Sequence, residues 1–181
     1  MDEAGRGPLA GPVVAAAVIL PADKNPPTPF RDSKTLSHGQ REKLFHWLFE
    51  NGAEIGVGIV EHDGIDRLNI LRASLEAMKL AVQKLPALPE LLMIDGIFTL
   101  DMPEMRQEAI VKGDSKIPAI SAASIVAKVT RDRLMDGYHI KYPQYGFDRH
   151  KGYPTKEHRL LIAKFGPCPI HRLTFRGVKD V

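Results

Sequence analysis

The sequence predicts one α/β domain in which a mixed β-sheet is flanked by helices, with a small helical portion at the C-terminal end. Short apolar runs rich in β-branched residues occur early in the chain, and amphipathic helical segments alternate with them later. The 181 residues are 44% hydrophobic and 26% charged, proportions typical of a globular domain. The longest apolar run, over residues 13–20, is far shorter than the roughly 20 residues of a membrane helix, so we expect no membrane association.

The first half of the chain contains two expected strands and two expected helices. Val13–Leu20 lies between prolines and has the β-branched character of a strand. Ser37 can cap the first helix, and a strongly amphipathic pattern after Asp63 indicates the second, which Pro86 ends. The expected elements are, in order, a strand over 13–20, a helix over 37–50, a strand over 53–61 and a helix over 63–85.

The second half is expected to contain two more strands and two more helices. Pro118 fits the first turn of a long helix, where its missing N–H costs little. Thr155 can cap the last helix, which Gly166 and Pro167 end. The expected elements are strands over 91–95 and 108–112 and helices over 117–138 and 155–165.

Charge is distributed unevenly along the chain. Between Lys141 and Lys179 the sequence has nine Lys and Arg but only two acidic residues, and tyrosines occur among them. This pattern fits either a surface that binds a polyanion or an ordinary solvated basic surface. The single cysteine, Cys168, excludes an intrachain disulfide and favours a reducing compartment such as the cytoplasm.

Acidic residues with unusual neighbours occur at three places. Asp2 and Glu3 precede Gly5-Arg6-Gly7, Asp95 ends an apolar strand, and Asp132 follows the apolar face of the long helix. Each also has an ordinary explanation: a polar turn at the terminus, an Asp-Gly turn and an ion pair on the helix surface.

If these four carboxylates converge, their mutual repulsion requires cations. Hard oxygen ligands suit Mg²⁺ or Mn²⁺, and two such ions can activate water and stabilise the leaving oxygen in phosphodiester cleavage. The glycines beside Arg6 let backbone amides approach a phosphate closely. The residues alone therefore indicate a metal-dependent phosphoryl-transfer site.

Several sequence blocks, in order along nearly the whole chain, resemble the ribonuclease HII family. Gly5-Arg6-Gly7 favours this type 2 family over type 3, whose opening block differs there. The matching blocks are 2–13 (DEAGRGPLAGPV), 32–34 (DSK), 41–42 (RE), 94–96 (IDG), 112–114 (KGD), 121–132 (SAASIVAKVTRD), 145–147 (YGF), 151–153 (KGY), His158 and 171–172 (HR).

The resemblance implies an RNase H-like fold, with a catalytic core over 1–138 and a basic helical extension over 139–181 packed on it as one functional unit. It implies a monomeric endonuclease that cuts the RNA strand of RNA–DNA hybrids and acts in DNA replication and repair. Single ribonucleotides embedded in duplex DNA would be cut on their 5′ side by two Mg²⁺ or Mn²⁺ ions, leaving 3′-hydroxyl and 5′-phosphate ends.

The family's site residues carry over onto this sequence by position. The four metal-site acids fall on Asp2, Glu3, Asp95 and Asp132, and Gly5, Arg6 and Gly7 would grip the backbone around the ribonucleotide. The tyrosine that stacks on the sugar at the RNA–DNA junction falls on Tyr153, with Tyr145 as the fallback. Further nucleic-acid contacts are implied for Lys34, Lys112, Ser121 and Lys128.

One position departs from the family pattern and keeps other functions open. The family has a strand running into the first catalytic aspartate, whereas here only Met1 precedes Asp2. A shortened strand and an α-ammonium near the acids would weaken metal binding. The alternatives are a chain that binds hybrids without cutting them, another metal nuclease of the same fold, such as a resolvase or exonuclease, and a subunit that depends on a partner.

Three further polar residues have unassigned roles. Asp114 fits either a group that orients the site or a turn residue. His158 fits contact with nucleic acid or metal as well as a structural role, and His171 favours a structural one.

Overall fold

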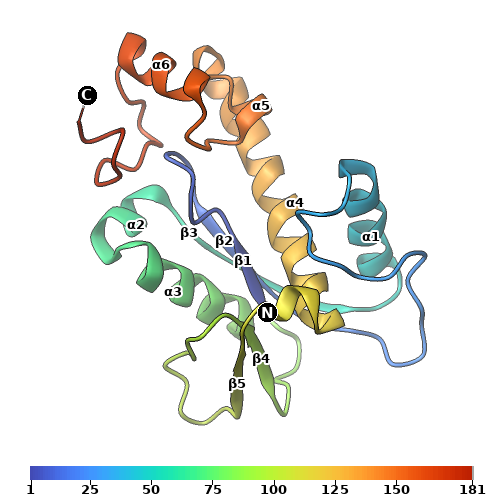
Figure 1. Cartoon of the computed structure of the whole chain (residues 1–181). Helices are drawn as coiled ribbons and strands as arrows, with labels where there is room; N and C mark the ends of the chain where they lie inside the picture. The colour runs from blue at the N-terminus through green and yellow to red at the C-terminus, as the bar shows by residue number, and fades with distance from the viewer. Residues whose placement is uncertain (181) are drawn as a thin grey trace.

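A mixed sheet lies at the centre of the computed structural model, which describes residues 1–180 (Figure 1). Three strands, β1 (Asp2–Ala4), β2 (Val13–Ile19) and β3 (Glu54–Val60), pair antiparallel in the order β1-β2-β3. Strands β4 (Leu92–Asp95) and β5 (Gln107–Ile110) pair parallel. Two hydrogen bonds at Met1 join the two sets: its amino group donates to Met93 and its carbonyl accepts from the Asp95 amide. The predicted mixed sheet is confirmed.

Helices cover both faces of this sheet, as Figure 1 shows. Alternate residues of β2 face opposite sides, as the period of a strand requires. Val13, Ala15 and Ala17 pack with the helix α3, whereas Ala16 and Val18 pack with α1 and α4. The helices are α1 (His38–Glu50), α2 (His62–Leu68), α3 (Ile70–Gln83), α4 (Pro118–Lys141), α5 (Phe147–His150) and α6 (Lys156–Phe165), with short 3₁₀ turns η1 (Gly113–Ser115) and η2 (Pro143–Tyr145).

The expected capping residues begin their helices as predicted. Ser37 and Gln40 form a reciprocal capping box at α1, and the Thr155 hydroxyl accepts from the His158 amide at α6. Helix α4 runs through to Lys141 and so crosses the boundary at residue 138, which stays a prediction. None of the helices within residues 1–180 has the length and apolar character needed to span a bilayer.

The prediction of a single helix over 63–85 is wrong, because the helix is interrupted at Asn69. This residue adopts φ 70° and ψ 162°, which separates α2 from α3. Asparagine tolerates positive φ better than most residues, and its side chain accepts from the Arg72 amide to cap α3. The hydrophobic periodicity continues across the break, so the pattern alone did not indicate it.

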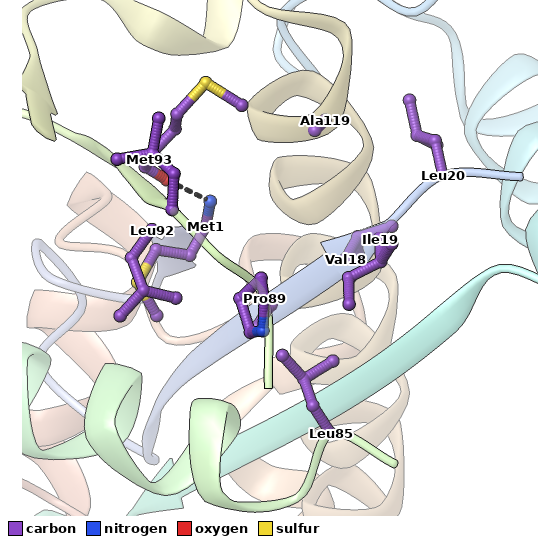
Figure 2. Close-up of a pocket in the computed structure, with 11 residues that line it drawn as sticks. Met1, Val18, Ile19, Leu20, Leu85, Pro89, Leu92, Met93 and Ala119 are labelled. Carbon is purple, nitrogen blue, oxygen red and sulfur yellow. Dashed lines mark hydrogen bonds between the residues drawn. The ribbon is translucent and has the colours of Figure 1, made fainter. Parts of the chain in front are cut away.

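A small apolar cavity of about 250 Å³ lies beside Met1, between the ends of β2 and β4 (Figure 2). Val18, Leu85 and Leu92 are among its lining residues. The dashed line in Figure 2 marks the bond of 2.7 Å from the Met1 amino group to the Met93 carbonyl. Burial lowers the pKa of this amino group to about 6, and the group is engaged with the sheet backbone.

Two buried arginines hold the loop after β1 through hydrogen bonds to its backbone carbonyls. Arg172 donates to five carbonyls of residues 5–12, and Arg131 donates to two carbonyls of the same loop and to that of Lys151. Both side chains are fully buried, and burial lowers the pKa of Arg131 to about 10 and of Arg172 to about 9. Both therefore stay charged near neutral pH, and carbonyl dipoles compensate that charge.

Replacing Arg172 by methionine should destabilise the protein by at least about 3 kcal/mol, because several buried carbonyls lose their donor at once. Arg172→Lys should rescue little, since one ammonium cannot reach the carbonyls that a planar guanidinium bridges. Urea unfolding measures both changes. Arg176→Met, at an exposed position four residues away, is the matched control, and equal loss in that variant would contradict the assignment.

Candidate active site

Three aspartates from different elements meet at one edge of the sheet. Asp2 lies on β1, Asp95 ends β4, and Asp114 lies in η1, shortly after β5. One carboxylate oxygen from each lies within 4.8 Å of the others. Parallel β4 and β5 bring their carboxyl ends to the same edge, and β1 lies next to β4. The topology therefore gathers acids that are far apart in sequence.

Hydrogen bonds from the backbone and from Ser121 hold these aspartates in place. The Gly113 amide donates to Asp95 Oδ1 at 2.7 Å, and the Glu3 amide donates to Asp2 Oδ1 at 2.7 Å. The Ser121 hydroxyl donates to the Asp114 carbonyl, which fixes the turn that presents this residue. The cluster is therefore built before any ligand binds.

Burial and mutual repulsion disfavour the charged forms of these acids. Asp2 is only 6% exposed, and burial, then Glu3 and Asp95, raise its pKa well above the ordinary value. Burial, then Asp32 and Asp95, likewise raise the pKa of Asp114, although Lys34 at 3.8 Å opposes the shift. A cluster of oxygen ligands that is unfavourable when ionised is suited to divalent cations, which would neutralise it.

Glu3 lines the same cavity as Asp2 and Asp95 but points its carboxylate toward Arg6. Its Oε1 accepts from Arg6 Nη1 at 3.2 Å. Burial raises its pKa, and the Arg6 charge acts in the opposite direction. Glu3 thus borders the three aspartates and connects them to the loop.

Asp132 does not join the acidic cluster, in contrast to the sequence-based expectation. Its Oδ1 accepts from Lys128 Nζ at 2.7 Å, one helical turn away, and the carboxyl does not line the cavity. Lys128 itself lines the cavity, with Nζ 5.6 Å from the centre of the Tyr153 ring. In this structure Asp132 pairs with Lys128, and its place among the metal ligands stays a prediction.

Asp114 was the acid that sequence reasoning left unassigned. The signal was present: the strand expected over 108–112 is followed by Gly113 and Asp114, just as the strand ending at Asp95 is followed by Gly96. In α/β folds ligand sites lie at the carboxyl ends of such strands. The sequence analysis favoured Asp132 because it follows the apolar face of the long helix, and it left the strand-end position of Asp114 without a role.

The backbone of the Gly5-Arg6-Gly7 loop is fixed on one side by buried arginines. Gly5 has φ 101°, and a Cβ there would lie 2.2 Å from Arg131 Nε, so no other residue fits. The carbonyls of Gly5 and Arg6 point inward and accept from Arg172. Because C=O and N–H point opposite ways across a trans peptide, the amides of Arg6 and Gly7 point away from Arg172. All three loop residues line the cavity.

The structure distinguishes the two candidate tyrosines. Tyr153 is 38% exposed and lines the cavity, and a Cβ placed on Gly7 would lie 3.7 Å from its ring. Tyr145 is 2% exposed, stacks on Phe147, and donates its hydroxyl to the Gly166 carbonyl at 2.7 Å. Burial and these contacts favour Tyr153 over Tyr145 as the stacking residue, and the choice between them stays a prediction.

The remaining predicted contacts divide in the same way. Lys34 lines the cavity, and a hydrogen bond of 2.6 Å from Ser124 to Ser33 fixes the loop that carries it. Ser121 is buried and donates to the Asp114 carbonyl, and its nucleic-acid contact stays a prediction. Lys112 is exposed at the turn before η1 and does not line the cavity. The cavity, of about 470 Å³, is lined by residues 2–7, Ser33, Lys34, Asp95, Ser124, Lys128 and Tyr153.

Replacing Asp2 by asparagine should raise the melting temperature when divalent cations are removed with EDTA. The raised pKa means that folding costs free energy while this carboxylate is ionised, and asparagine removes the charge but keeps an acceptor for the Glu3 amide. For a chain of this size each kcal/mol gained raises the melting temperature by roughly 2–4 °C. Calorimetry measures the melting temperature, with Asp101→Asn at an exposed position as the control. A melting temperature of Asp2→Asn below that of the wild type would contradict the repulsion.

Comparison with known proteins places the chain in one family. The model of the family "Ribonuclease HII" matches residues 1–178. Ribonuclease HII of Desulfotalea psychrophila is 54% identical, covering 99% of this chain and 80% of the relative, and that of Geobacter metallireducens is 54% identical, covering 99% and 84%. The crystal structure of ribonuclease H2 from Pyrococcus horikoshii superposes with a TM-score of 0.79 at 32% identity, covering 99% of this chain and 93% of that one. RNase HII in the PCNA:RNase HII complex from Archaeoglobus fulgidus superposes with a TM-score of 0.78 at 26% identity, covering 97% and 93%. The RNase H-like fold is confirmed, and the chain belongs to the ribonuclease HII family of nucleic-acid hydrolases.

Proposed function

We propose that this chain cuts the RNA strand of RNA–DNA hybrids and cuts duplex DNA on the 5′ side of a single embedded ribonucleotide, leaving 3′-hydroxyl and 5′-phosphate ends. One observation carries the proposal: a single cavity is lined by Asp2, Glu3 and Asp95, by the Gly5-Arg6-Gly7 loop and by the exposed ring of Tyr153, and Asp114 lies against Asp2 and Asp95. Family membership supports the hybrid substrate. We further propose that the chain acts as a monomer, since the acids, the loop and Tyr153 that line this cavity all come from one chain.

The acidic cluster fits Mg²⁺ or Mn²⁺. Its donors are carboxylate oxygens, and the raised pKa values of Asp2, Glu3 and Asp114 support a site that binds positive charge. We assign metal binding to these three residues and Asp95. Two bound cations would supply an activated water and neutralise charge on the leaving oxygen.

The chain's own residues would recognise the substrate on the other side of the cavity. The amides of Arg6 and Gly7 point away from buried Arg172 and are suited to the phosphate and the 2′-hydroxyl that distinguishes RNA from DNA. The Tyr153 ring would stack on the sugar at the junction. Lys34 and Lys128 line the same cavity and would contact neighbouring phosphates.

A labelled DNA duplex with one ribonucleotide tests this function directly. With Mg²⁺ or Mn²⁺ we expect one cut, 5′ to the ribonucleotide, no cut in the all-DNA duplex, and no cut in EDTA. Salt-dependent binding of the hybrid without any cut would instead indicate a binding protein. Cutting of the all-DNA duplex would indicate a different nuclease of the same fold.

Asparagine substitutions at Asp114 and Asp132 separate the structural assignment from the sequence-based one. Asp114→Asn should lower kcat/KM by more than about 100-fold, beyond the range typical of groups that only support metal ligands. Asp132→Asn should lower it by no more than about tenfold, because this carboxylate only orients Lys128. Steady-state cleavage of one hybrid substrate measures both, and the reverse order would restore Asp132 to the metal site.

Substitutions at the two tyrosines test the stacking surface. Tyr153→Ala should lower kcat/KM for the single-ribonucleotide duplex by roughly 5- to 150-fold, the range of 1–3 kcal/mol measured for stacking on aromatic side chains. Tyr145→Phe removes only the hydrogen bond to Gly166 and should cost about 1 kcal/mol of stability without changing substrate preference. A change of preference in Tyr145→Phe would contradict the buried role.

A further inference from the structure

We propose that His158 and His171 form a neutral, hydrogen-bonded relay that positions Tyr153, and that this relay sets the preference for a single embedded ribonucleotide. Both histidines are buried, with 0% and 1% of their surface exposed, so neither can touch nucleic acid. The inference rests on the proposed function of Tyr153. It adds two positioning residues that lie outside the cavity lining.

The hydrogen bonds determine the tautomer of each ring. His158 Nδ1 lies 3.0 Å from the Tyr153 carbonyl, which can only accept, so Nδ1 carries the proton. In a neutral ring His158 Nε2 is then an acceptor, and at 3.1 Å it receives the Nε2 proton of His171. His171 Nδ1 is left to accept from the Cys168 amide at 2.9 Å. The Cys168 carbonyl also lies 3.2 Å from His171 Nδ1, but the amide is closer and can only donate, so we assign Nδ1 as the acceptor.

The surroundings keep both rings uncharged. Burial lowers the pKa of His158 and of His171 to about 4, so both are neutral near pH 7. A second proton on His158 would go to Nε2 and place two donors against each other across the Nε2–Nε2 contact, and a second proton on His171 would go to Nδ1 and oppose the Cys168 amide. The relay therefore has one stable hydrogen-bond direction, from Cys168 toward Tyr153.

Tyr153 lies at the end of a backbone segment that buried side chains hold at each residue. Arg131 donates to the Lys151 carbonyl, His150 Nδ1 accepts from the Gly152 amide, and His158 donates to the Tyr153 carbonyl. Lys151 and Gly152 both have positive φ, at 49° and 82°, a conformation that needs such support. The position of the ring therefore depends on this network.

The far end of the relay is tied to the opposite wall of the cavity. His171 precedes Arg172, whose guanidinium binds the carbonyls of Gly5 and Arg6. One dipeptide thus supports the Gly5-Arg6-Gly7 loop directly and Tyr153 through His158. His171 and Arg172 together therefore determine the distance between Gly7 and the Tyr153 ring, where the junction sugar would lie.

Two amides at position 158 separate positioning from packing. Asparagine places an N–H near the position of Nδ1 and keeps the donor to Tyr153, whereas glutamine places its amide near Nε2 and loses that donor. Both leave one buried group without its partner, so both should destabilise the fold similarly. Dividing kcat/KM for the single-ribonucleotide duplex by kcat/KM for a continuous hybrid cancels any general loss of folded enzyme.

We expect this ratio to fall about tenfold in His158→Gln, since displacement of a contact by about an ångström has effects of this size or larger. It should stay within about twofold of wild type in His158→Asn. In a Tyr153→Ala background, His158→Gln should leave the ratio unchanged, because the ring it positions is gone. Equal ratios in the two His158 variants would overturn the relay.

A spectroscopic measurement tests the relay without cleavage. Labelling with 3-fluorotyrosine gives one ¹⁹F signal for each of the four tyrosines, and Tyr153→Phe assigns the relevant one. This signal should shift or broaden in His158→Gln and keep its position in His158→Asn. Equal perturbation by both variants would overturn the relay. Failure of the wild type to cut either substrate would overturn the proposed function alone.

Discussion

Two buried guanidinium groups organise the substrate side of this molecule. Arg131 and Arg172 are solvated by backbone carbonyls instead of by carboxylates, and most of those carbonyls belong to the loop after β1. Charge-assisted hydrogen bonds of this kind are strong, and removing one partner leaves buried acceptors unsatisfied. These contacts fix the direction of each peptide in the loop, so the anion binding that we propose for its amides would follow from how its carbonyls are held.

The acidic side of the cavity shows the opposite balance. Asp2, Asp95 and Asp114 are gathered by strand topology and by amide donors such as that of Gly113, although their charges repel one another. The cationic support of the loop and the anionic cluster meet at Arg6 and Glu3, whose ion pair joins them. The repulsion between these carboxylates lowers the stability of the fold and favours the binding of cations, as is common at catalytic sites.

Local signals predicted most of the elements, and the errors have physical causes. Ser37 and Thr155 indicated helix starts because capping is a short-range interaction. The break at Asn69 was missed because a single positive φ leaves hydrophobic periodicity unchanged. Asp2 was identified from its neighbours Glu3 and Gly5-Arg6-Gly7 and Asp95 from a strand end, whereas placing Asp114 beside them required knowing which strands are neighbours, and that depends on long-range pairing. Burial of Tyr145 likewise follows from packing against Phe147 and Gly166, which sequence spacing does not show.

The tie between Arg172 and the loop after β1 spans more than 160 residues of sequence. Closing a loop of this length costs conformational entropy, and contacts between residues so far apart in sequence slow folding. During synthesis Asp2, Asp95 and Asp114 leave the ribosome before Arg172, the residue that holds the loop. A nascent chain therefore carries all three carboxylates before it contains this arginine, so the loop reaches its final form only after Arg172 has been synthesised.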